Sequence, residues 1–262
     1  MNNKDLKLYL DKLNVVKVEN TLDFVQMLQK KHLAHFSFNN IAVLLGKEIS
    51  LDLEDIVTKV VQNNKGGYCF EHNKLFYEVL QELGFDVHFV VGKVLLTNEQ
   101  VHVPKTHRTT LLRFKNESYL VDVGFGFVCP SRPLKIHSNE VNDGYQIVKD
   151  NDGTFLLRLK TSDDFLTLYK FDQRTYSEAD CTMGNFYSSN YKNAVFVNNA
   201  VISLVKKDVT HSFRNNKYHI INKTSENIKE INSAVELQKL FKDTFSLTLT
   251  NEEAKIVFNK GL

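Results

Sequence analysis

The stretch from Lys65 to Asn73 constrains the fold more than any other part of this sequence, because a Gly-Gly pair leads directly into a helical pattern. Apolar residues then recur at the spacing of one helix face, at Phe76, Val79, Leu80 and Leu83. Gly84 follows as a stop signal, so Cys69 is predicted at or next to a helix N-terminus. Unpaired N–H groups and the positive end of the helix dipole meet there, which predicts a lowered thiol pKa and a thiolate near neutral pH.

Position alone does not make Cys69 reactive, because most free cysteines are small buried apolar groups. Two later segments favour a nucleophile: His107 offers a base, and Asp122 offers a carboxylate at the end of an apolar run. Residues 107–114 and 118–126 are predicted as strands of one hairpin, which would bring the histidine and the carboxylate together. A cysteine activated by a histidine that a carboxylate orients is the general logic of a nucleophilic triad.

The triad pattern leaves the type of reaction open. A Cys69 thiolate would attack an acyl carbonyl and hold the acyl group as a thioester. Whether water or an amine then accepts that group separates a hydrolase from a transferase, and both classes use the same three residue types. A catalytically idle protein that only binds a ligand is a further alternative.

The composition is that of a soluble globular protein, with 42% hydrophobic and 24% charged residues among 262. A net charge of +2 gives no general argument for binding nucleic acid or a membrane. Three cysteines in a chain of this size do not suggest a disulfide framework, and no apolar run approaches the ~20 residues of a membrane helix. We therefore predict a cytoplasmic protein. His72 lies near Cys69, but no paired Cys-x-x-Cys accompanies it, so no metal site is predicted.

The hydrophobic patterns change twice along the chain and predict an α+β fold in three parts. Residues 1–84 form a helical bundle that carries Cys69. Residues 85–190 form an antiparallel, barrel-like β domain that carries His107 and Asp122. Residues 191–262 form an α/β lid over the cleft.

Local signals place several element boundaries. Ser, Thr or Asp residues in N-cap positions predict five helix starts, at Thr21, Asp52, Ser177, Ser233 and Thr250. Asp152-Gly153 predicts a hairpin turn between two apolar runs, and Asn215-Asn216 predicts a second turn. Val195–Val205 is predicted as one strand, and residues 35–41 as irregular.

The three segments, in this order, resemble the arylamine N-acetyltransferase family. That family's pattern is Arg-Gly-Gly-Tyr/Phe-Cys, then a histidine, then Asp-Val-Gly-Phe-Gly. This chain has Gly-Gly-Tyr-Cys at 66–69, Thr-His at 106–107 and Asp-Val-Gly-Phe-Gly at 122–126, with Pro130 and Pro133 just beyond. The resemblance implies a core similar to that of cysteine proteases, with Cys69, His107 and Asp122 as the catalytic residues.

The resemblance also implies an activity. Such enzymes move an acetyl group from acetyl-CoA to an arylamine, arylhydroxylamine or hydrazine, in ping-pong order through an acetyl-cysteine, without a metal. By the same resemblance, Phe38 and Phe125 would contact the acceptor, and Pro104, Thr109 and Gly126 would flank CoA. An amide synthase of the same fold, which takes its acyl chain from a carrier protein, is the alternative within the resemblance. The acceptor and the oligomeric state do not follow from the sequence.

Two residues depart from the family pattern. Lys65 stands where arginine is usual, which keeps the charge but loses the planar guanidinium. Asn39 stands where glutamate is usual, so an ion pair between these two positions is not expected. We expect altered stability or acceptor preference from these changes more than lost activity.

Overall fold

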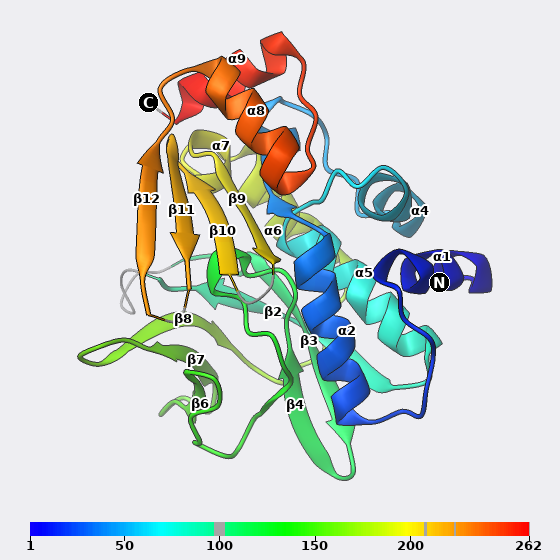
Figure 1. Cartoon of the computed structure of the whole chain (residues 1–262). Coiled ribbons are helices and arrows are strands. Elements are labelled where there is room, and N and C mark those ends of the chain that lie inside the picture. Colours follow the sequence, from blue (N-terminus) through cyan, green and yellow to red (C-terminus); the bar gives the residue numbers. More distant parts are fainter. Residues whose placement is uncertain (97–102, 207–208, 223, 262) are drawn as a thin grey trace.

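The computed structural model describes residues 1–96, 103–206, 209–222 and 224–261, and its helices and antiparallel strands are arranged as in Figure 1. The helices are α1 (Asn3–Leu13), α2 (Leu22–His35), α3 (Ile41–Leu44), α4 (Leu53–Ile56), α5 (Cys69–Glu82), α6 (Glu178–Asn190), α7 (Val195–Asn198), α8 (Ala234–Phe245) and α9 (Asn251–Lys260). The strands are β1 (Phe38–Asn39), β2 (Asp86–Val94), β3 (His107–Phe114), β4 (Glu117–Val121), β5 (Leu134–Lys135), β6 (Tyr145–Lys149), β7 (Phe155–Lys160), β8 (Phe165–Phe171), β9 (Val201–Lys206), β10 (Val209–Arg214), β11 (Lys217–Ile221) and β12 (Glu226–Glu230). The predicted α+β class is confirmed.

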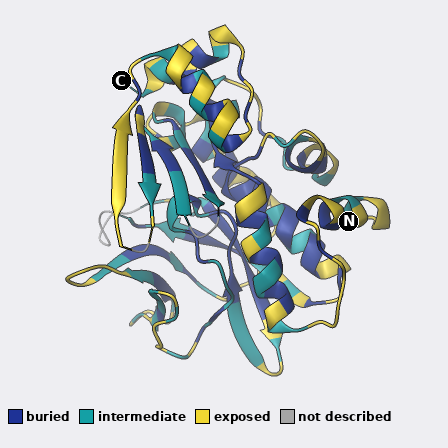
Figure 2. Cartoon of the chain, viewed as in Figure 1, coloured by how far each residue is buried: buried dark blue, intermediate teal, exposed yellow. Residues whose placement is uncertain are grey.

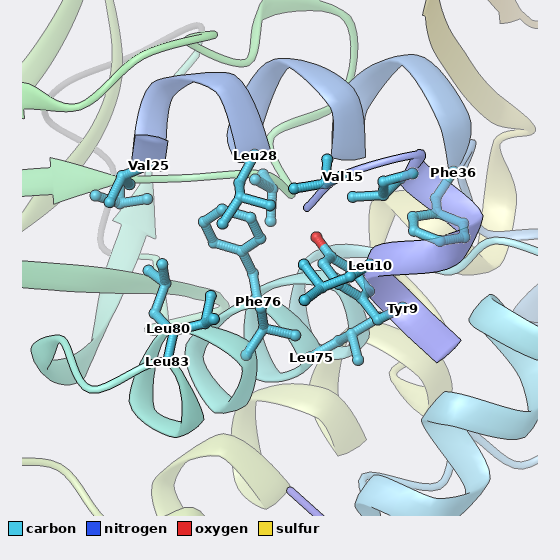
Figure 3. Packing of buried hydrophobic residues seen from close by; sticks show 14 of the residues in the cluster. Tyr9, Leu10, Val15, Val25, Leu28, Phe36, Leu75, Phe76, Leu80 and Leu83 are labelled. Carbon is cyan, nitrogen blue, oxygen red and sulfur yellow. The ribbon is translucent and has the colours of Figure 1, made fainter. Parts of the chain in front are cut away.

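Helices α1, α2 and α5 share a hydrophobic core, because each presents an apolar face to the other two. Figure 3 shows this core, in which Phe76 of α5 lies among side chains from α1 and α2. Thr21 caps α2 as predicted, since its hydroxyl oxygen accepts a hydrogen bond from the backbone N–H of Phe24 at 3.1 Å. Val57–Gln62 continues α4 with π-helical turns, so the helix predicted after Asp52 is present in two forms.

In the described residues, the middle of the chain forms a seven-stranded antiparallel sheet in the order β5-β4-β3-β2-β8-β7-β6. Strands β3 and β4 are hairpin neighbours as predicted, with Thr110 opposite Val121. Strand β4 ends at Val121, earlier than predicted, so Asp122 lies in the turn beyond it. The last residue of the predicted strand, Gly126, instead begins a 3-10 turn, Gly126–Val128. Strands β6 and β7 flank the predicted turn at Asp152-Gly153.

The later part of the chain forms a five-stranded sheet in the order β1-β9-β10-β11-β12 within the described residues. Its first strand comes from the N-terminal region: Phe38 pairs with Ser203 in antiparallel register. The turn predicted at Asn215-Asn216 is confirmed, and both asparagines have positive φ, of 47° and 57°. Strand β12 was not predicted, because all of its residues are exposed and lack apolar alternation (Figure 2).

Two sequence predictions about this sheet are wrong. The strand predicted at Val195–Val205 begins as helix α7, where the side chains of Asn198 and Asn199 donate to carbonyl oxygens four residues earlier, and becomes β9 only at Val201. The segment predicted as irregular contains β1, which is too short to show a period and depends on its pairing with β9. The three-part division at 84/85 and 190/191 stays a prediction.

Candidate active site

Cys69 is the first residue of α5, as predicted. Glu71 stabilises this helix start, because its Oε2 accepts a hydrogen bond from the backbone N–H of Tyr68 at 3.1 Å. The Cys69 thiol is buried, and its Sγ donates to the backbone carbonyl oxygen of Thr106 at 3.5 Å. Since Thr106 directly precedes His107, this contact holds the thiol against the start of β3.

His107 and Asp122 form a buried pair. His107 begins β3 and Asp122 follows the end of β4, so the hairpin brings the two side chains together. The distance from His107 Nε2 to Asp122 Oδ2 is 2.6 Å. Because Nε2 faces the carboxylate, Nδ1 is the ring nitrogen left to exchange a proton with a reacting group.

The Asp122 carboxylate receives hydrogen bonds on both oxygens. Oδ2 is 2.8 Å from the hydroxyl oxygen of Tyr169, in addition to His107. Oδ1 accepts from Asn73 Nδ2 at 2.9 Å and from the backbone N–H of Gly124 at 2.8 Å. Burial alone would raise the pKa of this carboxyl group, but the charge of His107 and these hydrogen bonds outweigh it, so the pKa of Asp122 is lowered. The site thus keeps a carboxylate in its interior.

The prediction of a lowered thiol pKa is wrong. Burial raises the pKa of Cys69, and the charge of Asp122 raises it further, while the N–H groups of Phe70 and Arg108 act in the opposite direction. The helix N-terminus is present but does not outweigh the loss of solvent. A thiolate at this position therefore needs a nearby positive charge, which the His107 ring would supply by taking the thiol proton.

The turn after Asp122 packs closely on the start of α5. A Cβ atom at Gly124 would lie 2.8 Å from the Cα of Cys69 and 2.7 Å from Asn73 Nδ2, closer than side chains can approach. Only glycine fits this contact, which lets the Asp-Val-Gly segment pack directly against the backbone of Cys69.

The two predicted acceptor residues contact different parts of the site. The Phe125 ring meets the His107 ring edge-on, with centroids 4.9 Å apart. Phe38 in β1 lies beside Gly126, since a Cβ atom there would be 3.6 Å from the Phe38 ring. Gly126 has a φ of +70°, which favours glycine at this close approach. The roles of these residues stay predictions.

The remaining cofactor residues differ in exposure. Thr109 is fully buried, and its hydroxyl group donates to the backbone carbonyl oxygen of Val121 at 3.1 Å. Pro104 is exposed, three residues before His107. Their predicted contacts with CoA also stay predictions.

Sequence reasoning missed three residues that surround the site: Asn73, Tyr169 and Phe196. Asn73 lies four residues after Cys69 on the same helix face, and this spacing is the one signal that pointed to it. Tyr169 reaches Asp122 from β8, and Phe196 lies with its ring centroid 6.0 Å from that of Phe38. Neither of these aromatic residues has a sequence signal near the motifs.

The two departures from the family pattern, Asn39 and Lys65, contact each other. Asn39 Nδ2 donates to the backbone carbonyl oxygen of Lys65 at 3.0 Å, so these positions are linked through the main chain. The nearby carboxylate of Glu71, in the first turn of α5, is paired with a different lysine: its Oε1 is 2.6 Å from Lys59 Nζ. The amide in place of a carboxylate therefore still ties β1 to the segment before Cys69.

Within the described residues, none of the helices has the length and hydrophobicity needed to span a bilayer. In the same part of the chain, no group of three or more His, Cys, Asp or Glu side chains is arranged to hold a metal ion. The cytoplasmic location stays a prediction.

The sequence is similar to those of known N-acetyltransferases. Residues 21–254 match the family model described as N-acetyltransferase. The arylamine N-acetyltransferase of Escherichia coli is 34% identical over 179 residues, which are 67% of this chain and 63%, less than two thirds, of that protein. The arylamine N-acetyltransferase of Mycobacterium bovis is 32% identical over 214 residues, 78% of this chain and 75% of that protein.

Solved structures agree over almost the whole length. The arylamine N-acetyltransferase structure from Salmonella typhimurium superposes with a TM-score of 0.92 at 25% identity and covers 99% of both chains. The Mycobacterium marinum arylamine N-acetyltransferase in complex with CoA superposes with a TM-score of 0.91 at 26% identity, over 97% of this chain and 98% of that one.

Proposed function

The chain belongs to the arylamine N-acetyltransferase family, and on that premise we propose that it transfers an acetyl group from acetyl-CoA to the nitrogen of an arylamine, arylhydroxylamine or hydrazine. One observation carries the proposal: a buried His107–Asp122 pair, with 2.6 Å between Nε2 and Oδ2, lies beside a cysteine at a helix start. The complex of the Mycobacterium marinum protein with CoA supports the choice of acyl donor.

In the first half-reaction, His107 Nδ1 takes the proton of the Cys69 thiol, and Sγ attacks the acetyl carbonyl carbon of acetyl-CoA. The bond between that carbon and the sulfur of CoA then breaks. The departing CoA thiolate takes the proton from His107, which leaves an acetyl-Cys69 thioester. Asp122 holds the imidazole ring and stabilises its charged form.

In the second half-reaction, the amine nitrogen attacks the thioester carbonyl carbon and loses one proton to His107. The bond to Sγ breaks, and the thiolate recovers a proton from His107, so the free enzyme returns. The donor leaves before the acceptor reacts, which makes the order ping-pong. No metal takes part in these steps.

The aromatic side chains at the site favour a ring-bearing acceptor over water. Phe38 and Phe125 are proposed to stack on the acceptor, because offset and edge-to-face contacts between rings are favourable. Gly126 is proposed to let the thioester arm of CoA approach the backbone, with Pro104 and Thr109 flanking that path.

The test is the intact mass of the protein after brief mixing with acetyl-CoA and no amine. The wild type should gain one acetyl group, and Cys69→Ser should gain none. Cys181→Ser is a matched control, since Cys181 is also buried but its Sγ contacts the Arg108 guanidinium group, whereas that of Cys69 contacts the backbone of Thr106. This variant should be acetylated like the wild type. Adding an arylamine should then remove the acetyl group.

Each of the other outcomes would indicate a different function. If no acetyl group is gained although Cys69 reacts fast with iodoacetamide, acetyl-CoA is not the donor and a carrier-bound acyl chain becomes the better hypothesis. If no group is gained and the thiol is slow, the protein only binds a ligand. If the acetyl group is lost to water before any amine is added, the protein is a thiol hydrolase.

A further inference from the structure

Four buried groups next to Phe38 form one continuous chain of hydrogen bonds: the side chains of Tyr9, His32 and His72 and the carbonyl group of Ser37. The Tyr9 hydroxyl oxygen is 2.9 Å from His32 Nδ1, and His32 Nε2 is 2.8 Å from His72 Nδ1. His72 Nε2 is 3.1 Å from the backbone carbonyl oxygen of Ser37. All three side chains are fully buried, and Figure 3 shows the hydroxyl oxygen of Tyr9 pointing into the core.

The Ser37 carbonyl oxygen determines which group is the donor in every hydrogen bond of this chain. A carbonyl oxygen only accepts hydrogen bonds, so His72 Nε2 must carry the hydrogen. A neutral imidazole has one N–H, which makes His72 Nδ1 an acceptor and His32 Nε2 its donor. His32 Nδ1 then accepts from the Tyr9 hydroxyl group. Each nitrogen and oxygen is satisfied in this one arrangement.

Both rings are neutral in this environment. Burial lowers the pKa of His72 to about 4, and burial lowers the pKa of His32 well below its usual value, with His72 acting in the same direction. A second proton on His72 would also place two N–H groups against each other at Nδ1. At neutral pH this chain of hydrogen bonds is therefore uncharged, and its hydrogen bonds keep one fixed direction.

The chain ends where the acceptor site and the thiol helix meet. His72 lies three residues after Cys69, one turn further along α5. Its ring stacks on the Phe38 ring, with centroids 6.4 Å apart and 23° between the planes. Ser37, whose carbonyl oxygen it binds, directly precedes Phe38, and the same oxygen accepts from the N–H of Gly67 at 3.3 Å. One side chain thus contacts both the ring and the backbone of the β1 segment.

We propose that Tyr9, His32 and His72 are positioning residues, which set the place of Phe38 relative to Cys69 and thereby the affinity for acceptors that carry an aromatic ring. Tyr9 comes from α1 and His32 from α2, so the chain links both helices to the reacting end of α5. The inference rests on the proposed function, because it assigns Phe38 to the acceptor.

The kinetic test compares aniline with hydrazine, an acceptor of the proposed class that has no ring. His72→Leu removes both bonds of the ring. We expect its KM for aniline to rise about tenfold, equivalent to ~1.4 kcal/mol, with a much smaller change for hydrazine. His72→Gln should restore the wild-type ratio, since one amide both accepts and donates. Tyr9→Phe, a milder change that removes the first donor, should shift the ratio in the same direction as His72→Leu.

A matched control lies in strands β10 and β11 of the five-stranded sheet. His211 Nδ1 is 2.7 Å from the hydroxyl oxygen of Tyr218, a bond of the same kind, and Tyr218 packs against Phe245 of α8. Tyr218→Phe should leave the ratio of the aniline and hydrazine KM values at the wild-type figure. Equal changes for both acceptors in His72→Leu and Tyr9→Phe, or none, would overturn the positioning role.

The direction of the chain has its own test, which does not depend on catalysis. In ¹⁵N NMR spectra of the wild type at pH 7, His32 and His72 should both be neutral with the hydrogen on Nε2. A hydrogen on Nδ1 of either ring, or a charged ring, would contradict the inferred arrangement. If the wild type never forms acetyl-Cys69, the proposed function fails, and the NMR result still decides whether the hydrogen-bond chain exists.

Discussion

Tyr169 and His107 bind the same carboxylate oxygen of Asp122. The Tyr169 hydroxyl oxygen is 2.8 Å from Oδ2, and His107 Nε2 is 2.6 Å from it. The two rings also touch, with centroids 4.7 Å apart. A residue of β8 therefore holds both the carboxylate and the imidazole that the proposed mechanism uses.

Tyr169→Phe should weaken catalysis and move its pH dependence. The ring contact remains, but Asp122 loses a donor to its charged form, so the pKa of Asp122 rises from its lowered value. Asp122 then becomes protonated at a higher pH, and activity should be lost earlier on acidification. We expect kcat/KM to fall by about tenfold or more, since a hydrogen bond to a charged group contributes ~1.5–3 kcal/mol and a factor of ten corresponds to ~1.4 kcal/mol.

The pH profile of kcat/KM checks this expectation. Tyr145→Phe is a suitable control, because the Tyr145 hydroxyl group donates to the backbone carbonyl oxygen of Val128 at 3.0 Å and not to the carboxylate. It should leave the acidic side of the profile in place. An unshifted profile in Tyr169→Phe would show that this hydroxyl group does not tune Asp122.

Asn73→Ala should destabilise the protein. Asn73 Nδ2 donates to the carbonyl oxygen of Arg108 at 2.6 Å and to Asp122 Oδ1, and its Oδ1 accepts from the N–H of Val123 at 3.0 Å. Removing the amide leaves these buried groups without that partner. We expect the free energy of unfolding to fall by about 3 kcal/mol, since a buried unsatisfied group costs ~1–3 kcal/mol.

Urea denaturation of Asn73→Ala and Asn198→Ala measures the difference. Asn198 Nδ2 donates to the carbonyl oxygens of Lys192 and Ala194, at 2.7 and 2.9 Å, but the residue is exposed, so water replaces its bonds. Its loss should stay below about 1 kcal/mol. Similar losses in the two variants would contradict the role given to burial at Asn73.

The sequence predicted those parts of the site that local patterns encode. The Gly-Gly pair and the apolar period place Cys69 at the start of α5, and the hairpin period places His107 beside Asp122. Tyr169 is 47 residues from Asp122 in the sequence and reaches it because β8 pairs with β2. Neither segment has a local pattern that predicts this contact, since tyrosine is common in half-buried strands of any sheet.

The same limit applies to electrostatics and to paired segments. The helix N-terminus at Cys69 is visible in the sequence, but the burial that raises its pKa is a property of the assembled fold. His32 and His72 are 40 residues apart and meet only because α2 and α5 pack together. Strand β1 exists through its pairing with β9, so its residues carry no strand signal of their own.

Arg108→Lys should destabilise the contact between β3 and α6. Arg108 is fully buried; its guanidinium group binds both carboxylate oxygens of Glu178, at 2.9 and 3.0 Å, and lies 4.1 Å from the centre of the Phe89 ring. Lysine keeps the charge but cannot stack as a plane on that ring. We expect a loss of about 2 kcal/mol in the free energy of unfolding.

Arg113→Lys is the matched control for that measurement, because Arg113 lies on the same strand but is exposed. Its unfolding free energy should stay within about 0.5 kcal/mol of the wild type. If both variants lose the same amount, the stacked guanidinium group contributes nothing particular to this contact.

His72 makes the stability of the fold depend on pH in a defined window. Its pKa is lowered from the usual 6.5 to about 4, so between these values the unfolded chain binds a proton that the folded protein does not. The free energy of unfolding therefore falls as the pH decreases from 6.5 to 4, by up to about 3 kcal/mol at ~1.4 kcal/mol per pH unit. His32 acts in the same direction, whereas the raised pKa of Glu71 acts in the opposite one.

His72→Gln isolates this contribution, because glutamine makes the same two hydrogen bonds but does not titrate. Its free energy of unfolding should fall less steeply than that of the wild type as the pH decreases from 6.5 to 4. Denaturation curves at several pH values measure both slopes, and the other groups cancel in the difference. Parallel slopes would mean that His72 binds its proton equally well in both states, which is incompatible with a neutral, fully buried ring.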